Sequence, residues 1–279
     1  MTQREFFTSA LALVFAMGVL ALVELAVPLL GRDRTEPRRL RANLGLTAIT
    51  LLSNWGLASF AAVLALSLSI EGGGLLGSLK LPLALLVAIT IPTLDLATYL
   101  AHRSMHALPS LWRVHRVHHA DAFLDVTTTF RQHPLETLWR FVWVVVPVWA
   151  LGLPALGVLA YRLASALQAI LEHANVRLWR PLEPISLLWV TPNMHKVHHS
   201  RALPQTDSNY GNLFSVFDRA FGTFRRTDEA YGVVYGLDDV DPARSASLLD
   251  LLRLRFDRTP AREALTPDPS RAVASASAG

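Results

Sequence analysis

The residues of this chain with the clearest chemical potential are its ten histidines, which all lie between His102 and His199. Eight of them form three clusters at spacings of three or four residues. The clusters are His102 and His106; His115, His118 and His119; and His195, His198 and His199. Residues three and four apart share one face of a helix, so we expect each cluster to direct its imidazoles at one point. Imidazole is a common metal ligand, and this many nitrogen donors suits iron, zinc, copper or nickel.

Three further residues are candidates for the same site. His173 follows an apolar segment and is expected as a ninth ligand, whereas His133 is either a ligand, a residue just outside the ligands or part of the substrate wall. Asp95 lies on one helical stripe with His102, inside another apolar segment. Ionisable residues inside membrane spans are candidate functional residues. We expect the Asp95 carboxylate to accept the free N–H of a ligating imidazole; the alternative is an ion pair with an arginine of another helix.

The elements that must position these residues are apolar helices. Of the 279 residues, 52% are hydrophobic and only 17% are charged, whereas a soluble domain carries about 25% charged residues. Residues 6–30, 43–70 and 79–101 are each long enough to cross a bilayer, which takes about 20 residues. Residues 137–174 are broken by Gly152 and Pro154 and predict a helical hairpin that returns His173 to the side of His133. We therefore expect an all-α integral membrane protein with three full spans, a hairpin and a helical cap.

The charge pattern predicts the orientation of this arrangement. Residues 31–41 carry five arginines, which by the positive-inside rule places that loop and the histidines in the cytoplasm. The N-terminus and the glycine turn at 72–74 are expected on the far side. The predicted divisions are membrane helices at 1–94, a catalytic domain at 95–225, a cap extension at 226–257 and a disordered tail at 258–279.

Several function classes lack their signatures. The chain has no cysteine, so disulfides, iron–sulfur clusters and cysteine nucleophiles are excluded. Neither HExxH, GxSxG nor a P-loop occurs. Gly72 to Gly77 matches the dinucleotide pattern but follows a membrane span instead of a strand, so we interpret it as a turn. The net charge of +4 fits a membrane protein, and we expect no nucleic-acid partner.

Seven motifs occur in an order that resembles one known family. They are HRSMH at 102–106, LWRVHRVHH at 111–119, DVTT at 125–128, HANVR at 173–177, TPNMHKVHH at 191–199, DSNYG at 207–211 and FGT at 221–223. Together they resemble the signature of the fatty acid hydroxylase/sterol desaturase superfamily, over residues 95–223. Some members carry one more histidine in the second helix of the hairpin, where this chain offers Gln168 and no histidine.

The resemblance implies a membrane-bound non-haem di-iron oxygenase. Two iron ions, which zinc can replace in purified protein, would be held by nine histidines and would use dioxygen to hydroxylate or desaturate a lipid such as a sterol, hopanoid, carotenoid or fatty acyl chain. Electrons would come from a separate donor, a ferredoxin or a cytochrome b5-type protein with its reductase. The expected location is the bacterial inner membrane, with the active site facing the cytoplasm. Alternatives are a membrane zinc hydrolase, with Glu172 or Glu136 as the base, and a non-catalytic metal-binding protein.

Overall fold

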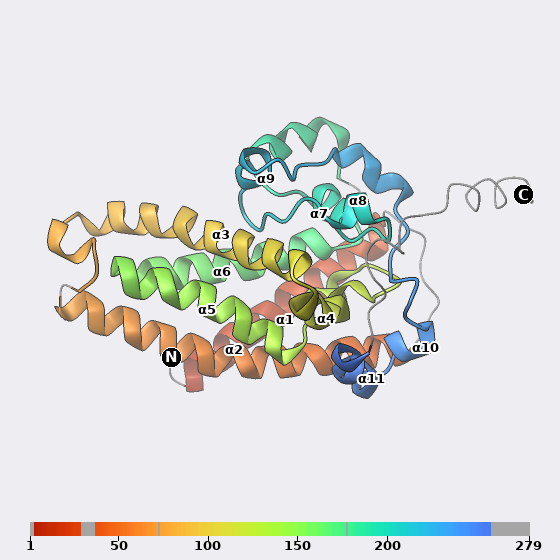
Figure 1. Cartoon of the computed structure of the whole chain (residues 1–279), viewed down its shortest axis with the longest axis horizontal. Helices are drawn as coiled ribbons and strands as arrows, with labels where there is room; N and C mark the ends of the chain where they lie inside the picture. The colour runs from red at the N-terminus through yellow and green to blue at the C-terminus, as the bar shows by residue number, and fades with distance from the viewer. Residues whose placement is uncertain (1–2, 29–36, 72, 177, 258–279) are drawn as a thin grey trace, which may run out of the picture.

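The computed structural model describes residues 3–28, 37–71, 73–176 and 178–257, and this part of the chain is helical with no strand, as predicted. Five long helices run along the molecule: α1 (Gln3–Ala26), α2 (Pro37–Glu71), α3 (Leu83–Ala107), α5 (Pro134–Leu151) and α6 (Ala155–His173). Six shorter helices lie at one end: α4 (Pro109–His119), α7 (Pro192–His198), α8 (Leu203–Thr206), α9 (Val216–Ala220), α10 (Pro242–Ser245) and α11 (Leu248–Arg253). Figure 1 shows the long helices packed as a bundle, with α4 and α7 at the same end.

Four helices of the described chain are long and apolar enough to cross a membrane: α2, α3, α5 and α6. The apolar stretch described for α1, Ala10–Ala26, is shorter. We expected three full spans and a hairpin. In the described residues both helices of the hairpin, α5 with 18 and α6 with 19 residues, are candidate spans, whereas α1 is not among them. Large apolar side chains remain exposed along these helices, as on Leu52, Val146 and Leu163.

The hairpin between α5 and α6 is present as predicted, and its turn lies at the end of the bundle opposite to the histidines (Figure 1). Gly152 ends α5 with a φ of +68°, a conformation that favours glycine. The N–H of Leu75 donates to the carbonyl of Ala150 at 3.0 Å, and that of Leu76 to Leu151 at 3.0 Å. The turn that follows α2 therefore touches the hairpin turn, so α5 and α6 extend as far as α2 and α3.

At the opposite end, polar side chains fasten the long helices to the loops around the histidines. Oε1 of Glu24, near the end of α1, accepts the N–H groups of Val126 at 2.8 Å and Asn175 at 2.7 Å. The guanidinium of Arg131 is fully buried and donates to Asn43 of α2 at 2.6 Å. The end of α1 and the start of α2 thus lie beside the histidines. Residues 29–36, which hold most of the arginine-rich loop, are outside the described residues.

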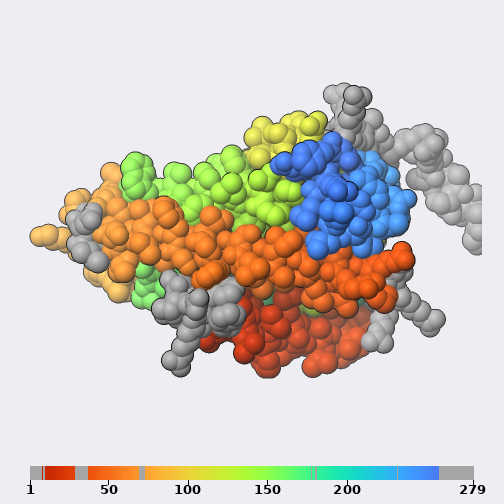
Figure 2. Space-filling view, turned by 90° about the horizontal axis from the view of Figure 1, so that it is seen from below, coloured from red at the N-terminus to blue at the C-terminus, as the bar shows by residue number. Residues whose placement is uncertain are grey.

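The C-terminal part of the described chain covers α2 near its start. Leu251 of α11 and Leu254 pack against Ala42 and Leu46 of α2 and against Val117 of α4. Figure 2 shows this segment (blue) resting on α2 (orange), with α1 (red) along the same face. The predicted disordered tail at 258–279 lies outside the described residues.

Candidate metal centre

The end of α3 and the starts of α4 and α7 bring the histidine clusters together. His102 and His106 occupy the last turns of α3, and α4 begins directly afterwards with Pro109 at its first position. Proline is favoured there because the first N–H of a helix has no partner within it. Thr191 caps α7 as its sequence predicts, with its hydroxyl accepting the N–H of Met194 at 3.3 Å. The local sequence therefore turns each cluster inwards at one end of the bundle.

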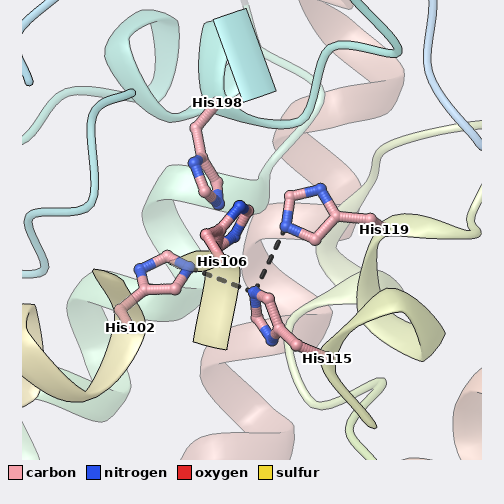
Figure 3. Close-up of side chains that lie close together, drawn as sticks. All are labelled: His102, His106, His115, His119 and His198. Atoms are coloured by element: carbon pink, nitrogen blue, oxygen red, sulfur yellow. Dashed lines mark hydrogen bonds between the residues drawn. The ribbon is translucent and has the colours of Figure 1, made fainter. Parts of the chain in front are cut away.

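Nine histidines form two buried groups. Within each group, one nitrogen of every imidazole lies within 4.8 Å of the others. The first group is His102, His106, His115, His119 and His198, and the second is His118, His173, His195 and His199. Each of the nine is at most 5% exposed. Figure 3 shows the five imidazoles of the first group converging from α3, α4 and α7.

Each HxxHH triplet is divided between the two groups, so the expectation that a triplet converges on one point was wrong. In α4, His115 and His119 point into the first group and His118 into the second. In α7 the division is reversed, because His198 joins the first group while His195 joins the second. Positions i+3 and i+4 lie on either side of position i when viewed along the helix. One short helix can therefore supply two adjacent sites, and the ring centroids of His119 in the first group and His199 in the second are 4.6 Å apart.

Hydrogen bonds on the outer side of the rings fix which nitrogen carries the proton. Nδ1 of His118 lies 3.3 Å from the carbonyl of Arg131, and Nδ1 of His173 lies 2.7 Å from the carbonyl of Ala169. A carbonyl only accepts, so both Nδ1 atoms donate and both Nε2 atoms hold lone pairs. Those two Nε2 atoms face each other at 3.0 Å. Two buried lone pairs at this distance repel each other unless a cation binds both.

The first group repeats this arrangement. Nδ1 of His102 donates to the carbonyl of Tyr210 at 3.0 Å, and Nδ1 of His115 lies 3.0 Å from Oε2 of Glu136. The Nε2 atoms of His102 and His115 then face each other at 3.2 Å. Imidazole nitrogens bind a metal ion at about 2.1 Å, so two adjacent ligands at right angles are about 3 Å apart. Both groups therefore have the spacing and the tautomers that metal binding requires.

The electrostatic surroundings keep five of these imidazoles, which lie on α4 and at α7, neutral. Burial, together with the neighbouring imidazoles, holds the pKa values of His118, His119, His195 and His199 well below the usual range. Burial and the nearby His115 lower the pKa of His198 to about 3. At neutral pH the nitrogens therefore carry lone pairs, and protons do not compete with a metal ion for them.

Two carboxylates contact the outer nitrogens of the first group. Oε2 of Glu136 lies 3.0 Å from His115, and Oδ1 of Asp207 lies 3.2 Å from Nδ1 of His106. Such carboxylates orient a ligating imidazole and strengthen it as a donor. Sequence reasoning missed both roles, considering Glu136 only as the base of a hydrolase. Its place in the first turn of α5, three residues after His133, could have indicated proximity to the histidines.

The structure places Asp95 differently from the expectation, and for His133 it excludes the first of the three alternatives, a metal ligand. The Asp95 carboxylate accepts the N–H groups of Leu213 at 3.0 Å and Phe214 at 2.9 Å, and it bonds to no histidine among the described residues. The expected bond to a ligating imidazole is thus corrected: Asp95 precedes His102 by two helical turns, about 10 Å along the axis, although both share one stripe. His133 lies outside both groups, where it caps α5 by accepting the N–H of Leu135 at 3.1 Å.

A cavity of about 160 Å³ leads from the second group into the helix bundle. His118, His173, His195 and Glu172 line its inner end. Its walls continue along α5 and α6 and include Arg140. A ligand could therefore reach the histidines from within the bundle.

Comparisons with known proteins agree with this geometry. A family model described as fatty acid hydroxylase matches residues 87–223. Ornithine lipid hydroxylase OlsE from Rhizobium tropici is 34% identical over 143 residues, which are 51% of this chain and 43% of that protein. Alkylglycerol monooxygenase is 29% identical in Caenorhabditis elegans, over 51% of this chain and 28% of that protein. The human alkylglycerol monooxygenase is 28% identical, over 54% of this chain and 33% of that protein.

The match thus spans less than half the length of these relatives, and no solved structure matches. The matched region nevertheless contains all ten histidines. It therefore includes both histidine groups and the cavity residues beside them. The resemblance carried by the seven motifs is confirmed: residues 87–223 match the fatty acid hydroxylase family model, and about half of the chain aligns with lipid hydroxylases and monooxygenases of the fatty acid hydroxylase/sterol desaturase superfamily.

Proposed function

We propose that this protein is a membrane-bound non-haem di-iron oxygenase that hydroxylates a lipid, using dioxygen and electrons from a separate donor. The observation that carries the proposal is the pair of adjacent groups of buried imidazoles with inward-facing lone pairs. The matched relatives include an ornithine lipid hydroxylase, alkylglycerol monooxygenases and a fatty acid hydroxylase. These names favour hydroxylation over desaturation.

The five-histidine group would hold one iron ion and the four-histidine group the other, within a catalytic domain at 95–225. Bound iron would supply the activation of dioxygen and the oxidation of an unactivated C–H bond. The chain itself supplies orientation and shelter from water. Glu136 and Asp207 hold the rings of His115 and His106 in place, while the cavity beside His118, His173 and His195 receives the substrate.

The zinc hydrolase alternative is less well supported. A hydrolase needs a free carboxylate beside metal-bound water, but Glu136 already contacts His115 and accepts from Nε of Arg140 at 3.0 Å. Oε1 of Glu172 lies 3.8 Å from Nε2 of His195, so Glu172 is the remaining candidate for the base of a hydrolase. The names of the relatives favour the oxygenase.

We further propose that the protein lies in the bacterial inner membrane with the histidines on the cytoplasmic side. The four apolar helices and the arginine-rich sequence between α1 and α2 support this orientation. It would give the metal site access to cytoplasmic electron donors, either a ferredoxin or a cytochrome b5-type protein with its reductase.

The proposal is tested by lipid mass spectrometry of cells supplied with ¹⁸O₂. Cells that produce the wild-type protein should contain a lipid with one added ¹⁸O atom, and cells that produce His118→Ala should not. His133→Ala is the matched control, because His133 lies outside both groups, and it should retain the product. A product that carries oxygen from water instead of dioxygen would refute the oxygenase and support the hydrolase.

A further inference from the structure

Arg162 is a charged residue inside an apolar helix. It lies in α6, one of the four candidate spans, and its side chain is half-buried. No hydrogen bond or ion pair joins its guanidinium to another residue in the part of the chain that the structure describes. An arginine in a span is energetically costly, and such residues are typically retained for binding or transport.

Arg162 lies where two cavities meet. It lines the cavity that reaches the histidines and also a second cavity of about 180 Å³ between α1, α2 and α6. The second cavity is mainly apolar, with Leu13 of α1 and Trp55 of α2 among its lining residues. Leu159 and Leu163 also line it and are 48% and 55% exposed. Side chains that border the second cavity thus also reach the apolar outer surface of the helices. Figure 2 shows α1 and α2, which line this cavity, side by side.

A second polar side chain faces the same junction. Asn54 of α2 lines both cavities, is half-buried, and has no hydrogen bond within the described ranges. Arg162 and Asn54 come from different helices, and the packing of α6 against α2 places both in the lining of the same two cavities. Arg140, the other arginine of the inner cavity, is neutralised by Glu136 at 3.0 Å. Arg162 is thus the cation of this passage that lacks a partner among the described residues.

We infer that Arg162 and Asn54 bind the acidic group of an amphiphilic substrate, either a carboxylate or a phosphate. A guanidinium donates two parallel hydrogen bonds to such a group, and the Asn54 amide can donate another. Arg162 precedes His173 by 11 residues on α6, which corresponds to about 16 Å along the helix. A long-chain acid held at Arg162 can therefore extend its apolar chain to the histidines. The substrate class is an acidic lipid that is oxidised far from its acidic group.

That this ligand is the substrate rests on the proposed function, but the binding itself does not. The test therefore measures binding to zinc-loaded protein in a neutral detergent, where no turnover occurs. The radiolabelled probes are palmitate, hexadecyl phosphate and hexadecanol, which share one chain length. Wild-type protein should bind at least one of the two acids more tightly than the alcohol, and the preferred acid distinguishes a carboxylate source from a phosphate source.

Arg162→Gln should weaken binding of the preferred acid by about 10- to 100-fold, the factor expected for losing hydrogen bonds to a charged group. It should change hexadecanol binding little. Arg162→Lys keeps the charge and should retain much of the affinity, which also guards against a folding artefact. Arg38→Gln is the matched control, because it removes the same charge at an exposed position outside both cavities, and it should bind all three probes normally.

The inference is wrong if wild-type protein binds hexadecanol as tightly as both acids, or if Arg162→Gln weakens acid and alcohol equally. Arg162 would then have a structural role or would bind the headgroups of membrane lipids outside the protein. If the acids bind as expected but cells show no incorporation of ¹⁸O into lipid, the acid site stands and the proposed oxygenase function fails. The two hypotheses are therefore separable.

Discussion

Replacing Glu136 by glutamine should weaken metal binding at one of the two histidine groups and leave the other unchanged. Each carboxylate oxygen of Glu136 has a polar neighbour: Oε2 lies at ion-pair distance, 3.0 Å, from Nδ1 of His115, and Oε1 accepts a hydrogen bond from Nε of Arg140 at 3.0 Å. The side chain is fully buried. Glutamine has one oxygen, so its amide nitrogen must face a donor at the other position. The variant thus loses a negative charge and one of two acceptors.

The size of the effect follows from these contacts. A hydrogen bond to a charged group contributes about 1.5–3 kcal/mol, and every 1.4 kcal/mol changes an equilibrium constant about tenfold. We therefore expect metal affinity at the five-histidine group to fall by about 10- to 100-fold, the range usual for residues that hold a ligand in place. The assay titrates metal-free protein with Co²⁺ in competition with a fluorescent chelator. Wild-type protein should bind about two ions per chain, because it has two groups of donors.

In Glu136→Gln, one of the two binding steps should weaken, and Glu136→Asp should weaken it less because the charge is kept. Asp95→Asn is the matched control: it also converts a buried carboxylate into an amide, but Asp95 bonds to no histidine among the described residues. Equal weakening of both steps, or normal binding in a correctly folded Glu136→Gln protein, would refute the assigned contact. A single ion in the wild-type protein would refute the dinuclear site.

Asp95→Asn should lower the stability of the purified protein by about 1–3 kcal/mol, because one of the N–H groups of Leu213 and Phe214 would then face an amide donor; a thermal unfolding curve with unchanged midpoint would contradict this. Single cysteines in the cysteine-free chain should report the orientation, because Lys80 and Arg201 are both exposed and lie at opposite ends of the bundle. An impermeant thiol reagent should label Lys80→Cys from outside and Arg201→Cys only after the membrane is opened, and labelling of both from one side would refute the orientation.

The sequence alone determined the properties that depend on local spacing. The positions of His115, His118 and His119 predicted a helix that directs imidazoles inwards, and α4 is that helix. The apolar lengths predicted membrane helices, and Gly152 with Pro154 predicted the hairpin. These features follow from helical periodicity and from backbone conformation, which a few neighbouring residues define.

Only the tertiary structure decided which distant residues meet. Periodicity fixes the face of a helix on which a side chain lies. It fixes neither which segment packs against that face nor the position along the helix axis at which the two make contact. Asp95 shares a stripe with His102 and yet binds the loop at 213–214. His198 joins His102, 96 positions earlier in the chain, and Arg162 and Asn54 line the same two cavities. Each of these pairings results from the packing of helices remote in sequence, which local patterns do not encode.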